Sequence, residues 1–205
     1  AAGDISSVVT QIHAQANKAP LPVERTANVN WDSSVDLDLS STDLDGDLLT
    51  YTITKAPLYG DLSSTAPKMQ YKFSQDKRPI AVNEHLLDNV EFEITDGWGG
   101  KSKGIIHILV YRPNRAPLAG TDFISATANT PILLDKTKLL ENDSDIDGDT
   151  LSIVDIIPQI DTKGIVSKSG EQYIFNPQGQ FLYLSADQRV LDQLKYIVAD
   201  VNGAK

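Results

Sequence analysis

Residues 35–39 read Val35-Asp36-Leu37-Asp38-Leu39, a strict alternation of aliphatic and acidic side chains. Successive side chains of a β-strand point to opposite faces, so the aliphatic side chains share one face and the carboxylates share the other. The segment is therefore predicted to be a strand that buries one face and keeps the other in water.

Similar short segments fill the rest of the chain, and clusters of Gly, Pro, Asn and Asp separate them. Helical spacing is almost absent; Ala186, Val190 and Leu194 share a helical face, which leaves room for a short helical turn at 185–193. Many short strands divided by turn signals predict an all-β protein made of antiparallel sandwiches. The other predicted strands are 49–54, 69–73, 90–95, 105–111, 132–134, 151–156, 173–175 and 194–199.

Two landmarks and two weaker echoes recur in the same order in both halves of the chain. Such a repeat predicts two homologous domains of about 100 residues. We place them at 17–113 and 114–205, as two tandem immunoglobulin-like antiparallel β-sandwich domains. The repeated segments are Asn17-Lys18-Ala19-Pro20-Leu21 with Asn114-Arg115-Ala116-Pro117-Leu118, Asp43-Leu44-Asp45-Gly46-Asp47 with Asp145-Ile146-Asp147-Gly148-Asp149, Tyr71-Lys72-Phe73 with Tyr173-Ile174-Phe175, and Asp96-Gly97-Trp98-Gly99 with Asp200-Val201-Asn202-Gly203.

The two ends of the chain are predicted not to coincide with the domain boundaries. Residues 8–16 alternate like a strand and run into Asn17 as 104–111 run into Asn114, so 1–16 are predicted to be a strand left from a preceding repeat. The second domain reaches its last hairpin turn and is predicted to lack its last strand. We expect residues 5–16 of one copy to complete the second domain of another, head to tail; the alternative is a frayed N-terminus and a partly disordered second domain.

Composition limits the classes of partner. The chain has 28 acidic and 18 basic residues, a formal net charge of −10 and no cysteine. No nucleic-acid partner is expected, because binding to the phosphate backbone needs a basic face, and thiolate metal sites and disulfides are excluded. The longest apolar runs are a few residues against the roughly 20 that cross a bilayer, so no membrane insertion is expected. Cations are the expected ligands.

The strongest chemical signal is Asn142-Asp143-Ser144-Asp145-Ile146-Asp147-Gly148-Asp149, with four carboxylates in seven residues. Calcium accepts roughly six to eight oxygen ligands in flexible geometry and would neutralise this charge, whereas magnesium demands a stricter octahedron. An EF-hand is excluded, because loop position 12 counted from Asp143 is Val154 and the flanks are predicted strands. The sequence therefore predicts Ca²⁺ as the cofactor; the alternative is that Asp and Gly simply form solvated turns.

Further ligands are predicted from the geometry of an immunoglobulin-like sandwich. Its second and sixth inter-strand loops lie at one end, where the N-terminal linker also enters. Each calcium ion is therefore predicted to lie at a domain junction. The candidate metal ligands are Asn17, Asp43, Asp45, Asp47 and Asp96 in the first domain and Asn114, Asp143, Asp145, Asp147, Asp149 and Asp200 in the second.

The order of these motifs resembles the cadherin-like calcium-binding tandem repeats of large bacterial surface adhesins. The motifs are Asn-x-Ala-Pro, then Asn-Asp-x-Asp-x-Asp-Gly-Asp-x-Leu, then a strand, then Asp-Gly-x-Gly-Gly, and the resemblance covers residues 17–205. The first domain departs from it, with Ser41 where the second has Asp143. The resemblance implies cadherin-like folds and an extracellular, cell-surface or secreted module that calcium stiffens, acting as a spacer or in adhesion beside neighbouring repeats.

Two other binding functions stay open, a calcium-dependent carbohydrate-binding module and a calcium-dependent self-association module. Trp98, at the tip of a predicted hairpin, could stack on a sugar ring or pack against a turn or a neighbouring domain. His13, His85 and His107 lack the spacing of a zinc site. No GxSxG, P-loop or GxGxxG motif occurs, so no enzyme is expected, although the count of carboxylates leaves a glycosidase-like pair open.

Overall fold

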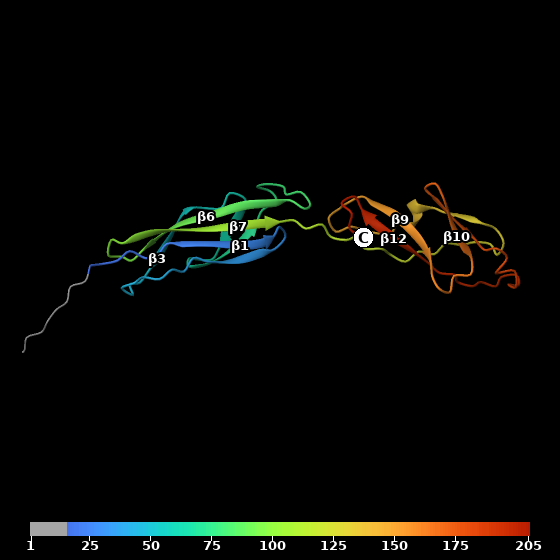
Figure 1. The fold of residues 1–205 in the computed structure, drawn as a ribbon, viewed down its shortest axis with the longest axis horizontal. Helices are drawn as coiled ribbons and strands as arrows, with labels where there is room; N and C mark the ends of the chain where they lie inside the picture. Colours follow the sequence, from blue (N-terminus) through green and yellow to red (C-terminus); the bar gives the residue numbers. More distant parts are fainter. Residues whose placement is uncertain (1–15) are drawn as a thin grey trace, which may run out of the picture. The chain divides into compact units, whose positions relative to one another are not determined.

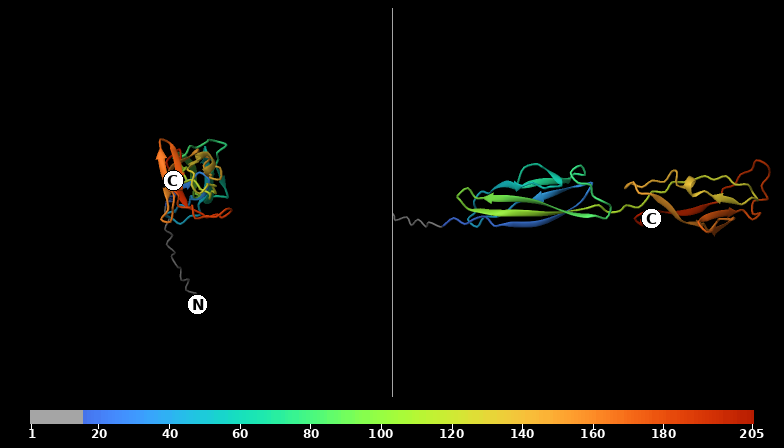
Figure 2. Two further views of the ribbon diagram at one scale, coloured as in Figure 1. Left: turned by 90° about the vertical axis from the view of Figure 1, so that its right-hand side faces the viewer. Right: turned by 90° about the horizontal axis from the view of Figure 1, so that it is seen from above.

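The computed structural model describes residues 16–205, so the predicted N-terminal strand at 5–16 lies outside the described residues except for its last one. The chain divides into two compact units, 1–113 and 114–205, which we call domain 1 and domain 2 (Figure 1, Figure 2). Strands form nearly all the regular structure of both, which confirms the predicted all-β class. Within 16–205 there is no helix of the length and hydrophobicity that a membrane span needs.

Domain 1 is a sandwich of two sheets with the strand orders β1-β7-β6-β3 and β2-β5-β4. Neighbouring strands are antiparallel except β1, which runs parallel to β7. Its strands are β1 (Val23–Asn30), β2 (Ser34–Asp38), β3 (Thr50–Lys55), β4 (Gly60–Ser63), β5 (Lys68–Phe73), β6 (His85–Thr95) and β7 (Lys101–Tyr111).

The core of domain 1 comes from alternation in these strands. Every second residue is buried from Asp88 onward in β6 and from Gly104 onward in β7. Leu37 and Leu39 are buried on the β2 side while Asp36 stays exposed. The alternation at 35–39 is therefore confirmed. The buried apolar side chains include Val90, Phe92, Ile94, Ile106, Ile108 and Val110.

Domain 2 has the sheets β10-β11-β8 and β12-β9 over a smaller core. Its elements are β8 (Ile132–Leu134), α1 (Lys136–Leu139), β9 (Leu151–Pro158), β10 (Ile165–Ser169), β11 (Gln172–Asn176) and β12 (Leu194–Asp200). The helical turn that we expected at 185–193 is wrong, since that segment forms turns and irregular structure. The only helix of the described residues is instead α1, where the Asp135 side chain accepts a hydrogen bond from the Thr137 N–H as an N-cap.

The two domains repeat one another in their strand pairing. An aromatic ring of β5 lies over Gly60, and the ring of Phe175 in β11 lies over Gly164; a Cβ atom would come within 2.1 Å of Tyr71 and 2.3 Å of Phe175. Gly60 and Gly164, like Asp96 and Asp200, are 104 residues apart, so Tyr71 corresponds to Phe175. The sequence comparison aligned residues 71–73 with 173–175. The strand pairing aligns Tyr71 with Phe175 instead, so that alignment is wrong by two residues.

Asp88 fixes the loop before β4 to strand β6 of domain 1. This carboxylate is 3% exposed and accepts hydrogen bonds from the N–H groups of Leu58, Tyr59 and Asn89 at 2.8–2.9 Å and from the Tyr71 hydroxyl at 2.9 Å. Burial and the neighbouring carboxylate raise the pKa of Tyr71 far above its ordinary value, so the phenol stays a donor. In domain 2, Asp192 accepts from the N–H groups of Lys163 and Gly164 in the same way.

We predict that Asp88→Ala destabilises domain 1 by about 3 kcal/mol or more, because four donors lose a buried, charged acceptor. Tyr71→Phe should cost only about 1 kcal/mol, since it removes one hydrogen bond. Urea unfolding followed by tryptophan fluorescence measures domain 1 alone, because it contains both tryptophans. The control is Asp61→Ala, which removes an exposed pair with Lys77 and should cost less than about 1 kcal/mol; an equal loss for Asp88→Ala would contradict the assignment.

Candidate metal centres

Three carboxylates converge in each domain. In domain 1, Asp43 and Asp47 come from the loop between β2 and β3, and Asp96 directly follows β6. One oxygen of each lies within 4.8 Å of the others. In domain 2 the same arrangement is formed by Asp145, Asp149 and Asp200, the last residue of β12.

Each acidic loop is folded by hydrogen bonds to its own main chain. The Asp43 carboxylate accepts from the Asp45 N–H at 2.7 Å, and the Asp145 carboxylate accepts from the Asp147 N–H at 2.7 Å. Gly46 and Gly148 then take φ values of +83° and +79°, which glycine adopts without a steric penalty. The loops therefore hold their carboxylates inward although the charges repel.

The carboxylate that follows the sixth strand is oriented by the N-terminal segment of its domain. The Asn17 amide donates to Asp96 at 2.7 Å and lowers the pKa of Asp96, together with the Trp98 and Gly100 N–H groups. Asn17 contacts the carboxylates as a donor, through its nitrogen.

Domain 2 repeats this contact. The Asn114 amide nitrogen donates to Asp200 at 2.9 Å, and the Ala204 N–H donates at 3.0 Å. Burial acts to raise the pKa of Asp200, but hydrogen bonds from Asn114 and the main chain leave it below its ordinary value. Both Asp96 and Asp200 are therefore held as charged groups.

Two features of the carboxylate groups fit a cation. The Oδ2 atoms of Asp43 and Asp145 are buried and accept no hydrogen bond. Burial, and then the charges of Asp43, Asp96 and Asp45, raise the pKa of Asp47. Unsatisfied buried oxygens and mutual repulsion in an all-oxygen donor set are the conditions that a bound hard cation relieves.

Asp45 and Asp147 are not members of these groups, and each accepts hydrogen bonds from the segment that enters its domain. The Asp45 carboxylate accepts from the Lys18 N–H at 2.7 Å and from its ammonium at 3.2 Å. Asp147, whose side chain is fully buried, accepts from the Arg115 N–H at 2.9 Å and from its guanidinium at 2.8 Å. These two candidate ligands therefore hold the entering chain.

Asp143 belongs to a different network in domain 2. It accepts from the Gly120 N–H at 2.7 Å and lies 3.1 Å from the Tyr196 hydroxyl, which also bonds Asp122 at 2.7 Å. Ser41, at the matching position of domain 1, donates to the Leu21 carbonyl instead. The two acidic loops therefore differ in the side chain that bonds the N-terminal segment of the domain, Ser41 in domain 1 and Asp143 in domain 2.

One contact near the second group was not predicted. The Asn202 amide donates to Asp149 at 2.6 Å. The sequence repeat aligned Asn202 with Trp98. The sequence of the turn does not indicate which carboxylate the Asn202 side chain contacts.

Of the other candidate residues, His85 and His107 belong to neither acidic group, whereas the Trp98 N–H donates to Asp96 at 2.7 Å. His85 stacks on Tyr111 with ring centroids 4.2 Å apart, and His107 lies 2.7 Å from the Asn89 amide oxygen. His13 lies outside the described residues. Trp98 is 77% exposed on the hairpin between β6 and β7, beside Asp96.

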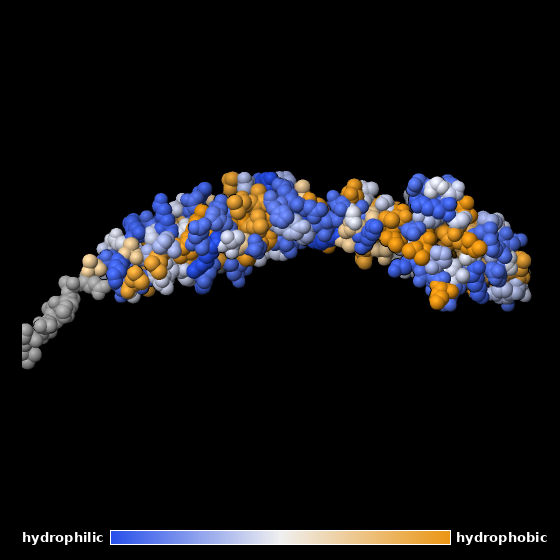
Figure 3. All heavy atoms as spheres, viewed as in Figure 1, coloured by the Kyte–Doolittle hydropathy of each residue, from blue (hydrophilic) through white to orange (hydrophobic). Residues whose placement is uncertain are grey.

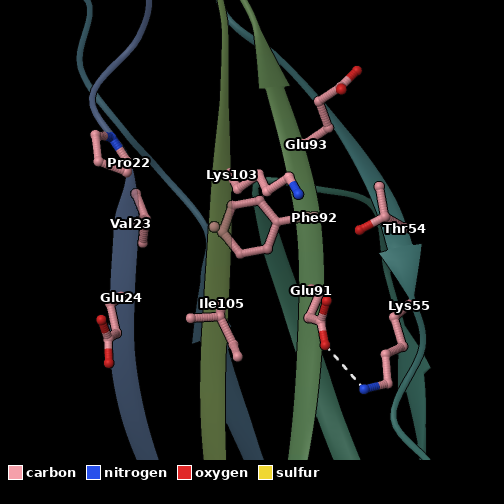
Figure 4. A pocket seen from close by; sticks show the side chains of 11 residues that line it. Pro22, Val23, Glu24, Thr54, Lys55, Glu91, Phe92, Glu93, Lys103 and Ile105 are labelled. Atoms are coloured by element: carbon pink, nitrogen blue, oxygen red, sulfur yellow. Dashed lines mark hydrogen bonds and ion pairs between the residues drawn. The ribbon is translucent and has the colours of Figure 1, made fainter.

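A shallow groove of about 720 Å³ crosses the sheet β1-β7-β6-β3 (Figure 4). Glu91 and Glu93 line it, and each is held by a lysine at 2.9 Å, Lys55 and Lys101 respectively.

Family models match both halves of the chain. Residues 17–108 match a bacterial Ig domain, and residues 113–205 match a cadherin-like domain. Domain 1 is a bacterial Ig domain and domain 2 is a cadherin-like domain. These matches confirm the resemblance that the sequence motifs indicated. No curated protein matches the chain.

Several solved structures are similar to the chain, which spans about a quarter of the length of the first of them. An endo-fucoidan hydrolase of glycoside hydrolase family 107 is 17% identical with a TM-score of 0.33, over 80% of this chain and 25% of that one. Protocadherin gamma B2 extracellular cadherin domains 1–5 are 15% identical with a TM-score of 0.36, over 88% and 36%. The human desmocollin-1 ectodomain is 11% identical with a TM-score of 0.34, over 93% and 35%.

We predict that Asp147→Ala in the cadherin-like domain accelerates hydrogen exchange of the Arg115 amide roughly tenfold or more, because a charge-assisted hydrogen bond is lost. The matched variant Asp149→Ala changes the same loop without touching Arg115 and should leave that amide protected. Exchange is followed by NMR in EDTA. Equal acceleration in both variants would show that Asp147 does not hold the entering segment.

Proposed function

We propose that each group of three carboxylates binds one calcium ion and that the chain is a calcium-stiffened spacer or adhesive module of an extracellular bacterial surface protein. The observation that carries this proposal is the pair of buried carboxylate oxygens, Asp43 Oδ2 and Asp145 Oδ2, that no donor in the described residues satisfies. They occur at matching positions of the two domains. The family matches agree with such a module.

The donor set favours calcium among common cations. Every member of the two converging groups is a carboxylate, so these groups offer none of the nitrogen and sulfur donors that select zinc or copper. The loops are irregular and partly exposed, which suits a cation that accepts variable geometry more than magnesium, which needs a strict octahedron. The residues that would hold the ions are Asp43, Asp47 and Asp96 in the Ig domain and Asp145, Asp149 and Asp200 in the cadherin-like domain.

Stiffening would follow from what the same loops hold. Asp45 and Asp147 belong to the acidic loops and fix Lys18 and Arg115 through hydrogen bonds. An ion that fixes the loop therefore also fixes the segment through which the chain enters the domain. Neighbouring repeats of the same protein are the proposed partners, and the placement of the ions at domain junctions stays a prediction.

The proposed module has no catalytic role. The groove carboxylates are paired with lysines, and the converging carboxylates are explained by a cation. A sugar-binding role has less support. Two other aromatic residues in turns of domain 1, Trp31 and Tyr59, are covered by the guanidinium groups of Arg112 and Arg78 respectively. Calcium-dependent binding to a glycan array that Trp98→Ala abolishes would favour that role instead.

We expect calcium to stabilise both domains. A ligand at about 100 times its Kd adds roughly 2.7 kcal/mol to the free energy of unfolding, which raises the Tm of a domain of this size by several degrees. Calorimetry in EDTA, millimolar calcium and millimolar magnesium measures the shift, and tryptophan fluorescence isolates the Ig domain.

Asp→Asn variants distinguish calcium binding at the two sites. Asp145→Asn should abolish the calcium shift of the cadherin-like domain and leave that of the Ig domain. Asp161→Asn, on an exposed loop of the same domain, should leave both shifts unchanged. Identical melting curves in EDTA and calcium for the folded wild type would overturn the proposal.

The stiffening is tested separately by small-angle X-ray scattering. We predict that EDTA, or Asp149→Ala in calcium, broadens the distribution of conformers without unfolding either domain, while Asp161→Asn does not. If calcium raises the Tm yet the distribution is the same with and without the ion, the ions stabilise the domains but do not stiffen the chain.

A further inference from the structure

Asn202 is followed by Gly203 in the turn directly after β12. No other asparagine in the chain precedes a glycine. A glycine has no side chain to shield its main-chain nitrogen, and its backbone is freer than that of any other residue. An asparagine amide is therefore attacked most readily by the next main-chain nitrogen when that nitrogen belongs to glycine. The sequence makes Asn202 the amide of this chain that is most open to such a reaction.

The turn that contains Asn202 is accessible to water. Residues 201–203 are exposed. The Gly203 N–H donates to the Asp200 carbonyl at 3.3 Å, which is long for a hydrogen bond, so this nitrogen is held only weakly. The corresponding hairpin of domain 1 continues into β7 and still leaves Trp98 77% exposed. Exposure is therefore a property of this turn position in both domains.

Exposure alone does not distinguish Asn202. Hydrophilic and apolar residues are mixed over the surface of domain 2 on the face drawn in Figure 3. Asn129 is also exposed in a turn of domain 2, but Thr130 follows it. Asn202 differs in the glycine that follows it and in what its side chain contacts. Its amide nitrogen donates to Asp149 at 2.6 Å, and Asp149 is a member of the second carboxylate group.

We propose that Asn202 is a site of spontaneous deamidation and that the product adds a carboxylate to the second carboxylate group. The main-chain nitrogen of Gly203 attacks the side-chain carbonyl carbon of Asn202, and the new C–N bond closes a succinimide ring. The bond from that carbon to the side-chain nitrogen breaks, and this nitrogen leaves as ammonia with the proton of the Gly203 N–H. Water then opens the ring at either carbonyl, which leaves aspartate or isoaspartate at position 202.

The consequence for calcium binding rests on the proposed function of this group. The nitrogen that donates to Asp149 is replaced by a carboxylate oxygen, which cannot donate. Without a cation the new charge repels Asp149, and with a cation it attracts the ion that Asp149 binds. The affinity of a calcium site rises with the charge of its ligands. Deamidation therefore destabilises domain 2 in the absence of calcium and strengthens its binding of calcium.

The reaction distinguishes the two domains. The position in domain 1 that matches Asn202 is Trp98, which has no amide in its side chain. The two domains thus begin with the same arrangement of aspartates, and only domain 2 gains a further carboxylate. Because ammonia is lost, the modified form accumulates with the age of the molecule.

Peptide mass spectrometry of the full chain tests the reaction. The protein is kept for several days in EDTA under mildly alkaline conditions and is then digested with trypsin, which cleaves after Lys195. The peptide that begins at Tyr196 should gain about 1 Da, the difference between an amide and an acid. The peptide that contains Asn129 should keep its mass. Asn202→Gln retains an amide but closes the ring much more slowly, so it should remove the gain.

An unchanged mass of the Asn202 peptide, or equal gains at Asn202 and Asn129, would overturn the proposal. Calcium at about ten times its Kd should slow the gain roughly tenfold, because an ion held by Asp149 and Asp200 keeps the turn closed. The mass gain in EDTA does not depend on calcium binding. A wild type that gains mass but binds no calcium would therefore contradict the proposed function and leave the deamidation supported.

Calcium titration followed by NMR signals of domain 2 tests the consequence. Asn202→Asp reproduces the aspartate product and should bind calcium roughly tenfold more tightly than the wild type. The same variant should melt at a lower temperature than the wild type in EDTA. Asn129→Asp adds an equal charge in the turn before β8 and should leave the affinity within about threefold, because salt screens exposed charges outside the group. Equal calcium affinities of Asn202→Asp and the wild type would overturn the proposed effect on the site.

Discussion

The structure at the N-terminal end of each domain depends on one constraint. The main chain of the acidic loop holds several carboxylates close together. Two like charges at about 4 Å repel by roughly 4 kcal/mol at the effective dielectric of a protein surface. The loops cannot spread to relieve this repulsion, because Asp43 and Asp145 are bonded to N–H groups two residues ahead and a left-handed glycine closes the turn. A bound cation is the simplest way to neutralise such a site. The proposed calcium dependence would thus be a consequence of backbone geometry as much as of acidic composition.

The sequence predicted the sandwich class, and strict alternation located the strands wherever one face is buried and the other is wet. It missed β1, β4 and β10, which lie at the edges of their sheets. Val23–Asn30 buries only its first and seventh residues, and its parallel pairing with β7 depends on a partner far along the chain. No local pattern records such a partner. The apolar spacing at 186, 190 and 194 also occurs in a helix, but Leu194 belongs to β12.

The carboxylates were recognised from their density in the loops, and the repeat indicated which distant aspartate joins each loop. Spacing could not reveal which of the alternate carboxylates face the centre. Asp45 and Asp147 turn toward Lys18 and Arg115 because those residues offer a main-chain donor and a charge together. Asp143 turns toward Tyr196, which replaces the Phe92 of domain 1. Both outcomes depend on contacts between segments that no single loop contains.

Strand β12 ends at the candidate ligand Asp200, so the second carboxylate group is attached directly to the sheet of domain 2. In domain 1 the corresponding carboxylate, Asp96, accepts from the Gly100 N–H, so that this candidate ligand and the start of β7 are connected. In domain 2 the Asp200 carboxylate accepts from the Asn114 amide and from the Ala204 N–H, which belong to the entering segment and to the turn after β12. A cation at Asp200 would therefore order three elements at once: the end of β12, the turn that follows it and the segment that enters the domain.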